Sequence, residues 1–198
     1  DKYILDSECK FLYETKKINN TFEDFRAILR LAYENDIDLR IFLSPPHARL
    51  WETMASVGLY KTWEDWKRQI LRLDNEEALR AASSPFMIWD FSGYDKISTE
   101  AVPVNGDKVN GMRWYMDISH YTPEVGDLIL RKMYGLSKED WGVLLTADNI
   151  ESHLIKVSED RRKYRMSHPV DISEVDSAVV QVMDQAKWCN GSGRNKTN

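Results

Sequence analysis

The sequence predicts an α/β fold in which helices cover a sheet of parallel strands. Two short runs, 37–43 and 86–91, are rich in apolar residues and are followed by serine, proline or glycine, which is typical of strands that enter a buried sheet. Each run follows a stretch with apolar residues at helical spacing. This order of helix, strand, helix and strand favours parallel strands joined by helical crossovers, arranged as a three-layer α/β/α sandwich.

Six helices are expected from apolar residues that recur on one face and from residues that begin or end helices. They cover about 21–34, 48–57, 62–73, 123–134, 146–166 and 171–188. Thr21 and Thr62 stand where an N-cap is expected, and Gly58 stands where a helix commonly ends. The strongest start is Thr122–Glu124, where a cap, a proline and an acid follow one another, and Gly135 ends this helix.

Three parts of the chain are expected to differ in organisation. Residues 1–135 are predicted to form the α/β domain, 136–189 a helical C-terminal extension, and 190–198 a disordered polar tail. The first 20 residues are expected to form an arm with partial strand and helix. A long loop is predicted over 92–113, and long loops in compact domains are often functional.

Composition excludes several classes of partner. The net charge of −5 and the absence of a basic stripe give no reason to expect nucleic acid. No stretch reaches the roughly 18 apolar residues of a membrane span.

The two cysteines, Cys9 and Cys189, are too few for a disulfide scaffold or a zinc site, and whether they pair stays open. The four histidines show no metal-ligand spacing, so no metal or other cofactor is expected. The sequence leaves the oligomeric state open.

The residues that carry chemistry are Asp117 and His120, three apart in a predicted loop directly before the helix start at Thr122. A neutral imidazole can take a proton from a serine hydroxyl, and a carboxylate at its other nitrogen fixes the tautomer and stabilises the imidazolium. This spacing indicates His120 as a general base and Asp117 as the carboxylate that orients it. The alternative is a helix-capping loop in which Asp117 binds backbone N–H groups and His120 packs under Tyr121.

Further candidates follow from the predicted sheet, because ligands gather at the carboxyl ends of parallel strands. The segments Ser44–His47, Asp90–Asp95 and the Asp117/His120 loop are expected to meet there. The candidate substrate contacts are Ser44, His47, Tyr94, Trp114 and Tyr115. Ser44 is disfavoured as a nucleophile, because the following proline, Pro45, lacks the backbone N–H that would help to bind an oxyanion. His153 is expected to be solvated within its helix, and His168 to lie at a helix end.

Two features resemble a known family. The stretch from Tyr115 to Asp127, with its Asp-x-x-His before the helix, resembles the last conserved block of SGNH (GDSL-type) hydrolases and acyltransferases. The strand ends at Leu43–Ala48 and Trp89–Tyr94 resemble those of SGNH-like proteins in bacterial envelope polysaccharide and D-alanyl modification. The similarity covers about 21–135. It implies an esterase or O-acyltransferase, located in the bacterial periplasm or cell envelope, that acts on an acylated cell-envelope glycan or a small ester.

The chain departs from this family in two respects. It has no Gly-Asp-Ser or Gly-Ser-Ser turn after its first strand, and no Gly-x-Asn-Asp block. The serine in Gly191–Gly193 lies in the predicted tail and is a poor candidate for the nucleophile. Either the nucleophilic serine lies upstream of this chain, or the chain is a non-catalytic SGNH-like module for glycan binding or assembly. A third interpretation is a purely helical interaction domain, in which the two predicted strands are pieces of buried helix.

Overall fold

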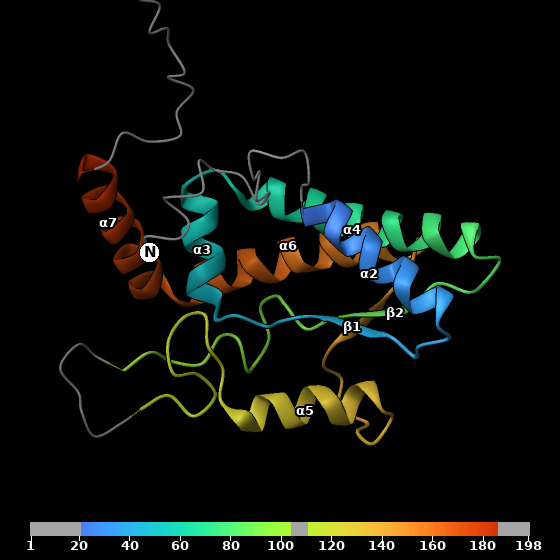
Figure 1. The fold of residues 1–198 in the computed structure, drawn as a ribbon. Helices are drawn as coiled ribbons and strands as arrows, with labels where there is room; N and C mark the ends of the chain where they lie inside the picture. The colour runs from blue at the N-terminus through green and yellow to red at the C-terminus, as the bar shows by residue number, and fades with distance from the viewer. Residues whose placement is uncertain (1–20, 104–110, 186–198) are drawn as a thin grey trace, which may run out of the picture.

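The computed structural model describes residues 21–103 and 111–185 (Figure 1). In chain order they form α2 (Thr21–Glu34), β1 (Arg40–Leu43), α3 (Ala48–Ser56), α4 (Tyr60–Arg80), β2 (Met87–Asp90), α5 (Pro123–Met133), β3 (Val143–Leu145), α6 (Ile150–Ser167) and α7 (Pro169–Gln185). The predictions for residues 1–20 and 190–198, for part of the loop over 92–113, and for the pairing of Cys9 with Cys189 lie outside the described residues.

All six predicted helices are present, and the differences concern their ends. α2 begins at the expected Thr21, and Gly58 follows α3 with a φ of +79°, as a helix-ending glycine does. α4 is longer than predicted: it begins at Tyr60, before Thr62, and continues to Arg80. The apolar periodicity stops early because two of the buried positions in the last turns are the acids Asp74 and Glu77.

The sheet has three strands in the order β1-β2-β3. β1 and β2 are parallel, as predicted, with Ile41 opposite Ile88. The prediction of a parallel sheet is wrong for β3, which pairs antiparallel with β2, so the sheet is mixed. Gly142 precedes β3 with a φ of +79°, and a Cβ at this position would overlap the Phe91 ring. Only glycine fits at this position. Here the chain turns into β3, which therefore runs antiparallel to β2. The sheet rules out the purely helical interpretation.

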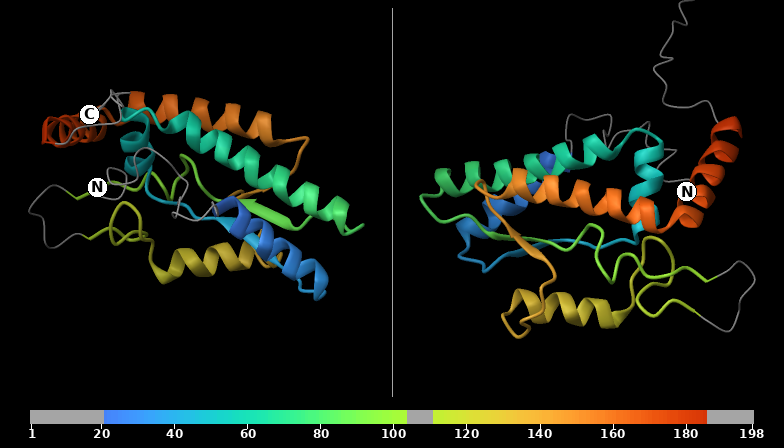
Figure 2. Two further views of the ribbon diagram at one scale, coloured as in Figure 1. Left: turned by 45° about the horizontal axis from the view of Figure 1, so that its top comes forward. Right: turned by 180° about the vertical axis from the view of Figure 1, so that it is seen from behind.

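Helices lie on both faces of the sheet (Figures 1 and 2). On the face of α2, α4 and α6 the buried cluster consists of Leu43, Ile70, Leu71, Ile88, Leu145, Ile150 and Leu154. On the other face α5 contributes Val125, Ile129 and Met133, which pack with Phe91, Tyr115 and Trp141. β3 and α6 belong to the segment predicted as a helical extension, yet their side chains are part of the first cluster. Within 21–103 and 111–185, no helix is long and apolar enough to cross a membrane.

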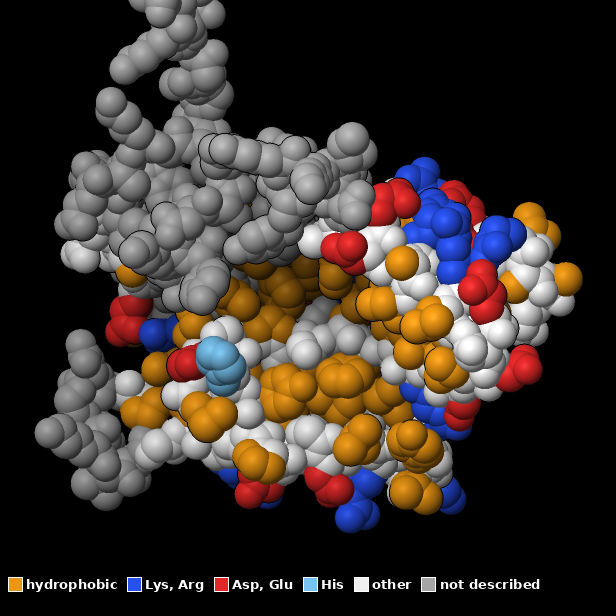
Figure 3. Space-filling view, viewed as in Figure 1, with side chains coloured by type: hydrophobic (Ala, Val, Ile, Leu, Met, Phe, Trp, Pro, Cys, Tyr) orange, Lys and Arg blue, Asp and Glu red, His pale blue; other side chains and the backbone are white. Residues whose placement is uncertain are grey.

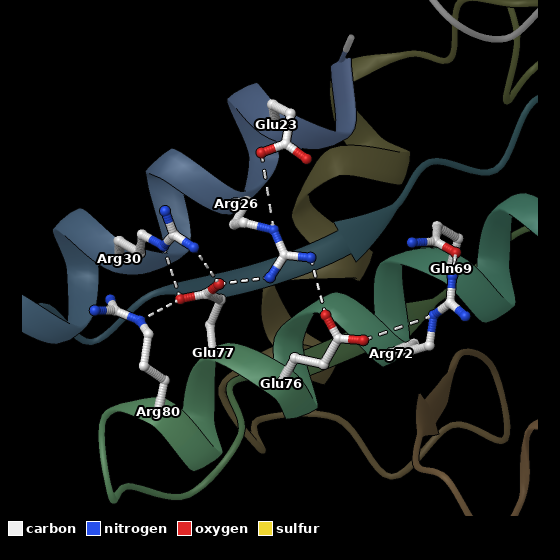
Figure 4. A network of polar contacts seen from close by, with 8 residues as sticks. All are labelled: Glu23, Arg26, Arg30, Gln69, Arg72, Glu76, Glu77 and Arg80. Atoms are coloured by element: carbon white, nitrogen blue, oxygen red, sulfur yellow. Dashed lines mark hydrogen bonds and ion pairs between the residues drawn. The ribbon is translucent and has the colours of Figure 1, made fainter. Parts of the chain in front are cut away.

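α2 is fastened to α4 by a cluster of arginines around one buried carboxylate (Figure 4). The Glu77 side chain is only 2% exposed and accepts hydrogen bonds from Arg26 at 2.6 Å, Arg30 at 2.9 Å and Arg80 at 2.6 Å. Arg26 also reaches the more exposed Glu76 at 2.9 Å. Burial alone would raise the pKa of Glu77. Hydrogen bonds from Arg30, which has the largest effect, and from Arg26 and Arg80 lower this pKa to about 2. The carboxylate is therefore charged at neutral pH, and the three arginines compensate its negative charge.

We expect Glu77→Gln to lower the free energy of unfolding at pH 7 by about 2 kcal/mol, because three arginines lose a buried charged acceptor. Glu76→Gln, which removes a charge half open to water, should cost less than about 1 kcal/mol. The stabilisation by Glu77 is present above its ordinary pKa and is lost as the pH falls towards about 2. Urea unfolding of the wild type and Glu77→Gln should therefore converge at low pH; a difference that does not change with pH would contradict this role.

Candidate functional site: the Asp117–His120 hairpin

Asp117 and His120 lie in a tight hairpin directly before α5. Tyr115 and Tyr121 form an antiparallel bridge, flanked by hydrogen bonds from the Met116 amide to the His120 carbonyl at 2.8 Å and from the Thr122 amide to the Trp114 carbonyl at 2.9 Å. Thr122 is the N-cap of α5, although its side chain makes no capping hydrogen bond, and Pro123 occupies the first turn. The helix therefore starts as the hairpin closes, which fixes the position of the loop.

Within the hairpin, Asp117 and His120 form a hydrogen-bonded pair. The Asp117 Oδ2 atom lies 2.7 Å from His120 Nδ1. The other oxygen, Oδ1, accepts hydrogen bonds from the backbone amides of Ser119 at 2.7 Å and His120 at 2.8 Å, and from the Ser119 hydroxyl at 2.9 Å. The carboxylate thus performs both functions considered from the sequence, since it caps the loop and also holds the imidazole.

The surroundings of Asp117 determine which ring nitrogen of His120 is free. The backbone amide of Ser119 and the His120 side chain hold the pKa of Asp117 well below its usual range, so this carboxyl is an ionised acceptor. A neutral His120 must then donate from Nδ1, which leaves Nε2 as an unprotonated acceptor. Nε2 has no hydrogen-bond partner within the described residues, and the side chain is 68% exposed. The pair therefore presents a base to the surface.

The hairpin is docked on the segment that follows β1. The Tyr115 side chain is buried, and its hydroxyl donates to the Pro45 carbonyl at 2.8 Å. The backbone amide of His47 donates to the Ile118 carbonyl at 3.0 Å. The first and third of the segments expected to converge at the end of the parallel strands do therefore meet, through the backbone of Ser44–His47.

His47 and Glu100 hold this junction together through hydrogen bonds. His47 is fully buried as the N-cap of α3; its Nδ1 accepts from the Arg49 amide at 3.2 Å, and its Nε2 lies 2.7 Å from the Glu100 carbonyl. Burial lowers the pKa of His47, so the ring is neutral. The Glu100 carboxylate accepts from the amides of Arg113 at 2.5 Å and Trp114 at 2.8 Å. Glu100 was not predicted, and nothing in the local sequence indicates that it holds the hairpin.

The other candidate residues do not all lie beside the pair. Ser44 is exposed and makes no hydrogen bond to His120 in the described part of the chain. Trp114 is half-buried, with the Arg113 guanidinium 4.0 Å from its ring centroid. Tyr115 acts through its hydroxyl on Pro45. Tyr94 lies elsewhere, because its hydroxyl donates to the buried Glu52 of α3 at 2.7 Å. The Glu52 carboxylate also accepts a hydrogen bond from Arg161 of α6 at 2.8 Å, so Tyr94 belongs to the contact between α3 and α6.

The end of β2 contains a second polar cluster, which is buried. Asp90 lies 2.5 Å from Lys67 Nζ of α4 and 2.9 Å from His153 Nε2 of α6, and also accepts from the Ser92 hydroxyl at 2.5 Å. Burial alone would raise the pKa of Asp90, but Lys67 and His153 lower it to about 2. The expectation that His153 is solvated is wrong, because its side chain is 8% exposed and turned onto Asp90. This cluster joins α4, β2 and α6 and is closed to ligands.

The surface around the pair is concave and partly apolar. Figure 3 shows a histidine beside an acidic side chain at the edge of a hollow whose walls carry many hydrophobic side chains. Of the four histidines His120 is the exposed one, while the others are buried or half-buried. His168 lies at the end of α6, as expected, and stacks on Tyr164. The arrangement presents an exposed imidazole, fixed in one tautomer, that can act as a base towards a bound ligand.

Within the described ranges, no group of three or more histidine, cysteine or acidic side chains is placed to hold a metal ion. Comparison of the chain with models of known protein families, with curated proteins and with solved structures finds no match. A function for the protein must therefore be argued from the geometry of the hairpin and from the pattern of its residues.

We expect Tyr115→Phe to lower the free energy of unfolding by about 1–2 kcal/mol, because the buried Pro45 carbonyl loses its hydrogen-bond donor. Tyr121→Phe provides the matched control: Tyr121 lies opposite Tyr115, and its hydroxyl makes no hydrogen bond with the described residues. Urea unfolding of both variants measures the difference. Equal losses in the two variants would contradict the docking role of the Tyr115 hydroxyl.

Proposed function

We propose that this protein is an esterase or O-acyltransferase that acts on an acylated cell-envelope glycan or a similar ester. His120 is the general base, and Asp117 orients it. The observation that carries this proposal is the 2.7 Å contact between Asp117 and His120 Nδ1, combined with a His120 side chain that is 68% exposed and whose Nε2 has no hydrogen-bond partner among the described residues. An ionised carboxylate on one side of the imidazole and an open position on the other are what a base needs to accept a hydroxyl proton.

The nucleophile in this proposal is a serine from a segment upstream of residue 1. His120 Nε2 takes the proton of the serine hydroxyl as its oxygen attacks the ester carbonyl. The same proton then passes to the leaving alkoxide when the ester bond breaks. Asp117 stabilises the imidazolium between these steps. The acyl group passes to water in an esterase, or to a glycan hydroxyl in an acyltransferase.

Two features of the described chain support this assignment. Ser44 is a poor internal substitute, since Pro45 follows it and no hydrogen bond links it to His120. The parallel pair β1–β2, with helices on both faces, is compatible with the SGNH-type three-layer sandwich that the sequence resembles. That resemblance also suggests the bacterial periplasm or cell envelope as the location.

The alternative is an SGNH-like module that binds a glycan or assists assembly without catalysis. It needs the same fold and a surface for sugar, but no base. Turnover separates the two, because only the enzyme requires the proton acceptor at His120.

We expect the natural full-length protein that contains residues 1–198 to hydrolyse p-nitrophenyl acetate, and His120→Ala to reduce kcat/KM by about 100-fold or more. Asp117→Asn should cause a loss of similar order, because an amide neither stabilises the imidazolium nor fixes the required tautomer. His168→Gln is the matched control, since His168 lies at the end of α6 and stacks on Tyr164. Its activity should equal that of the wild type.

Folding of each variant is checked by thermal unfolding, so that a loss of activity is not a loss of structure. If the full-length protein shows no turnover, or if His120→Ala is as active as the wild type, the acyl-transfer proposal fails and the binding module takes its place.

A further inference from the structure

A groove opens beside the Asp117–His120 hairpin, where the hairpin meets the first turns of α5. It has a volume of about 410 Å³ and is lined by Arg113, Trp114, Pro123, Glu124, Asp127 and Leu128. We call it the 113–128 groove. None of its lining residues is used by the base or by the carboxylate that orients it, so its chemistry needs a separate explanation.

The groove lies at the base of the hairpin that carries His120. Trp114 directly precedes the paired residue Tyr115, and Pro123 follows Tyr121 by two residues. The Thr122 amide donates to the Trp114 carbonyl at 2.9 Å, which joins the two sides of the groove. Trp114 is half-buried and packs against the cluster that includes Tyr115, so its indole forms a fixed wall of the groove.

The spacing along the hairpin suits one sugar unit. His120 is opposite Met116, whose amide donates to the His120 carbonyl at 2.8 Å. Trp114 precedes Met116 by two residues, which span at most about 7 Å of chain. A ligand bound over Trp114 and the start of α5 would therefore extend to His120 with its next group or its substituent.

The lining combines apolar surface with charged hydrogen-bonding groups. Pro123, Leu128 and the half-buried indole of Trp114 supply the apolar part. Glu124 and Asp127 are three residues apart and so share one face of α5, where their carboxylates accept hydrogen bonds. Arg113 supplies guanidinium donors beside the indole. A sugar ring matches this set, because it presents C–H groups on its faces and hydroxyls around its edge.

The charges select among ligands. Two carboxylates face one guanidinium in the lining, and Asp127 is also paired with Arg131 at 2.6 Å. Asp127 is thus balanced by Arg131, and Glu124 lies in the field of Arg113, so the groove has no excess charge to attract an ionic ligand. A plain acyl chain would remove three charged groups from water without hydrogen bonds in return. An uncharged ring with many hydroxyls can accept and donate hydrogen bonds here without bringing a charge of its own.

We infer that the 113–128 groove is a subsite for a neutral pyranose, which holds the glycan so that its ester reaches His120. The inference rests on the proposed function for the identity of the reacting group. The binding of sugar in the groove is a separate property and needs no turnover.

The test is a titration of the protein with tri-N-acetylchitotriose, the uncharged form of chitotriose, and with trigalacturonate, an anionic probe, followed by amide NMR. Chitotriose should cause saturable amide shifts at 113–114 and 124–128, and trigalacturonate should bind about tenfold more weakly or not at all. Glu124→Gln with Asp127→Asn should weaken chitotriose binding by about tenfold. Asp148→Asn, which removes an acid from an exposed turn elsewhere, should bind like the wild type.

Three results would overturn the inference: no saturable shift, shifts outside these segments, or equal binding by the double variant and the wild type. Tighter binding of trigalacturonate would also contradict it. Saturable binding in the groove without ester turnover in the full-length protein would support the subsite and overturn the acyl-transfer proposal. Turnover that depends on His120 without sugar binding would do the reverse.

Discussion

The hydrogen bond from the Tyr115 hydroxyl to the Pro45 carbonyl connects the candidate site to the sheet. Pro45 and Pro46 end β1 because neither can donate to a strand ladder, but their carbonyls remain available as acceptors. The buried Tyr115 uses one of them, and the His47 amide adds a second link to Ile118. An exposed loop thereby gains a fixed place at the carboxyl end of a parallel strand, where α/β folds gather their ligands.

Asp90 and Asp117 both have lowered pKa values, but their surroundings differ: one carboxylate is buried and the other is exposed. Asp90 is charged in a sealed cluster because Lys67 and His153 offset the effect of burial. Asp117 is charged at the surface because backbone amides and His120 donate to it. Both carboxylates hold a histidine, but His153 is enclosed while the Nε2 of His120 is open. Only the second arrangement can exchange a proton with a ligand.

The sequence was sufficient for elements with strong local patterns. Apolar periodicity located all six helices, and continuous apolar runs located β1 and β2. β3 was missed because three residues, Val143–Leu145, carry too little pattern, and its direction depends on the turn at Gly142. The Asp117–His120 contact was accessible because its two residues lie in one short loop. Lys67 and His153 lie 23 and 63 residues from Asp90 in the sequence, so no local sequence pattern predicts that they contact it.

Asp117 accepts a hydrogen bond from Nδ1 of His120 and so fixes the tautomer in which Nε2 is the free base. Nitrogen-15 NMR of the His120 ring, at a pH where the ring is neutral, measures this directly. We expect a protonated Nδ1 and an unprotonated Nε2 in the wild type, and loss of this preference in Asp117→Asn. A neutral ring that carries its proton on Nε2, or a tautomer that does not respond to Asp117→Asn, would contradict this assignment.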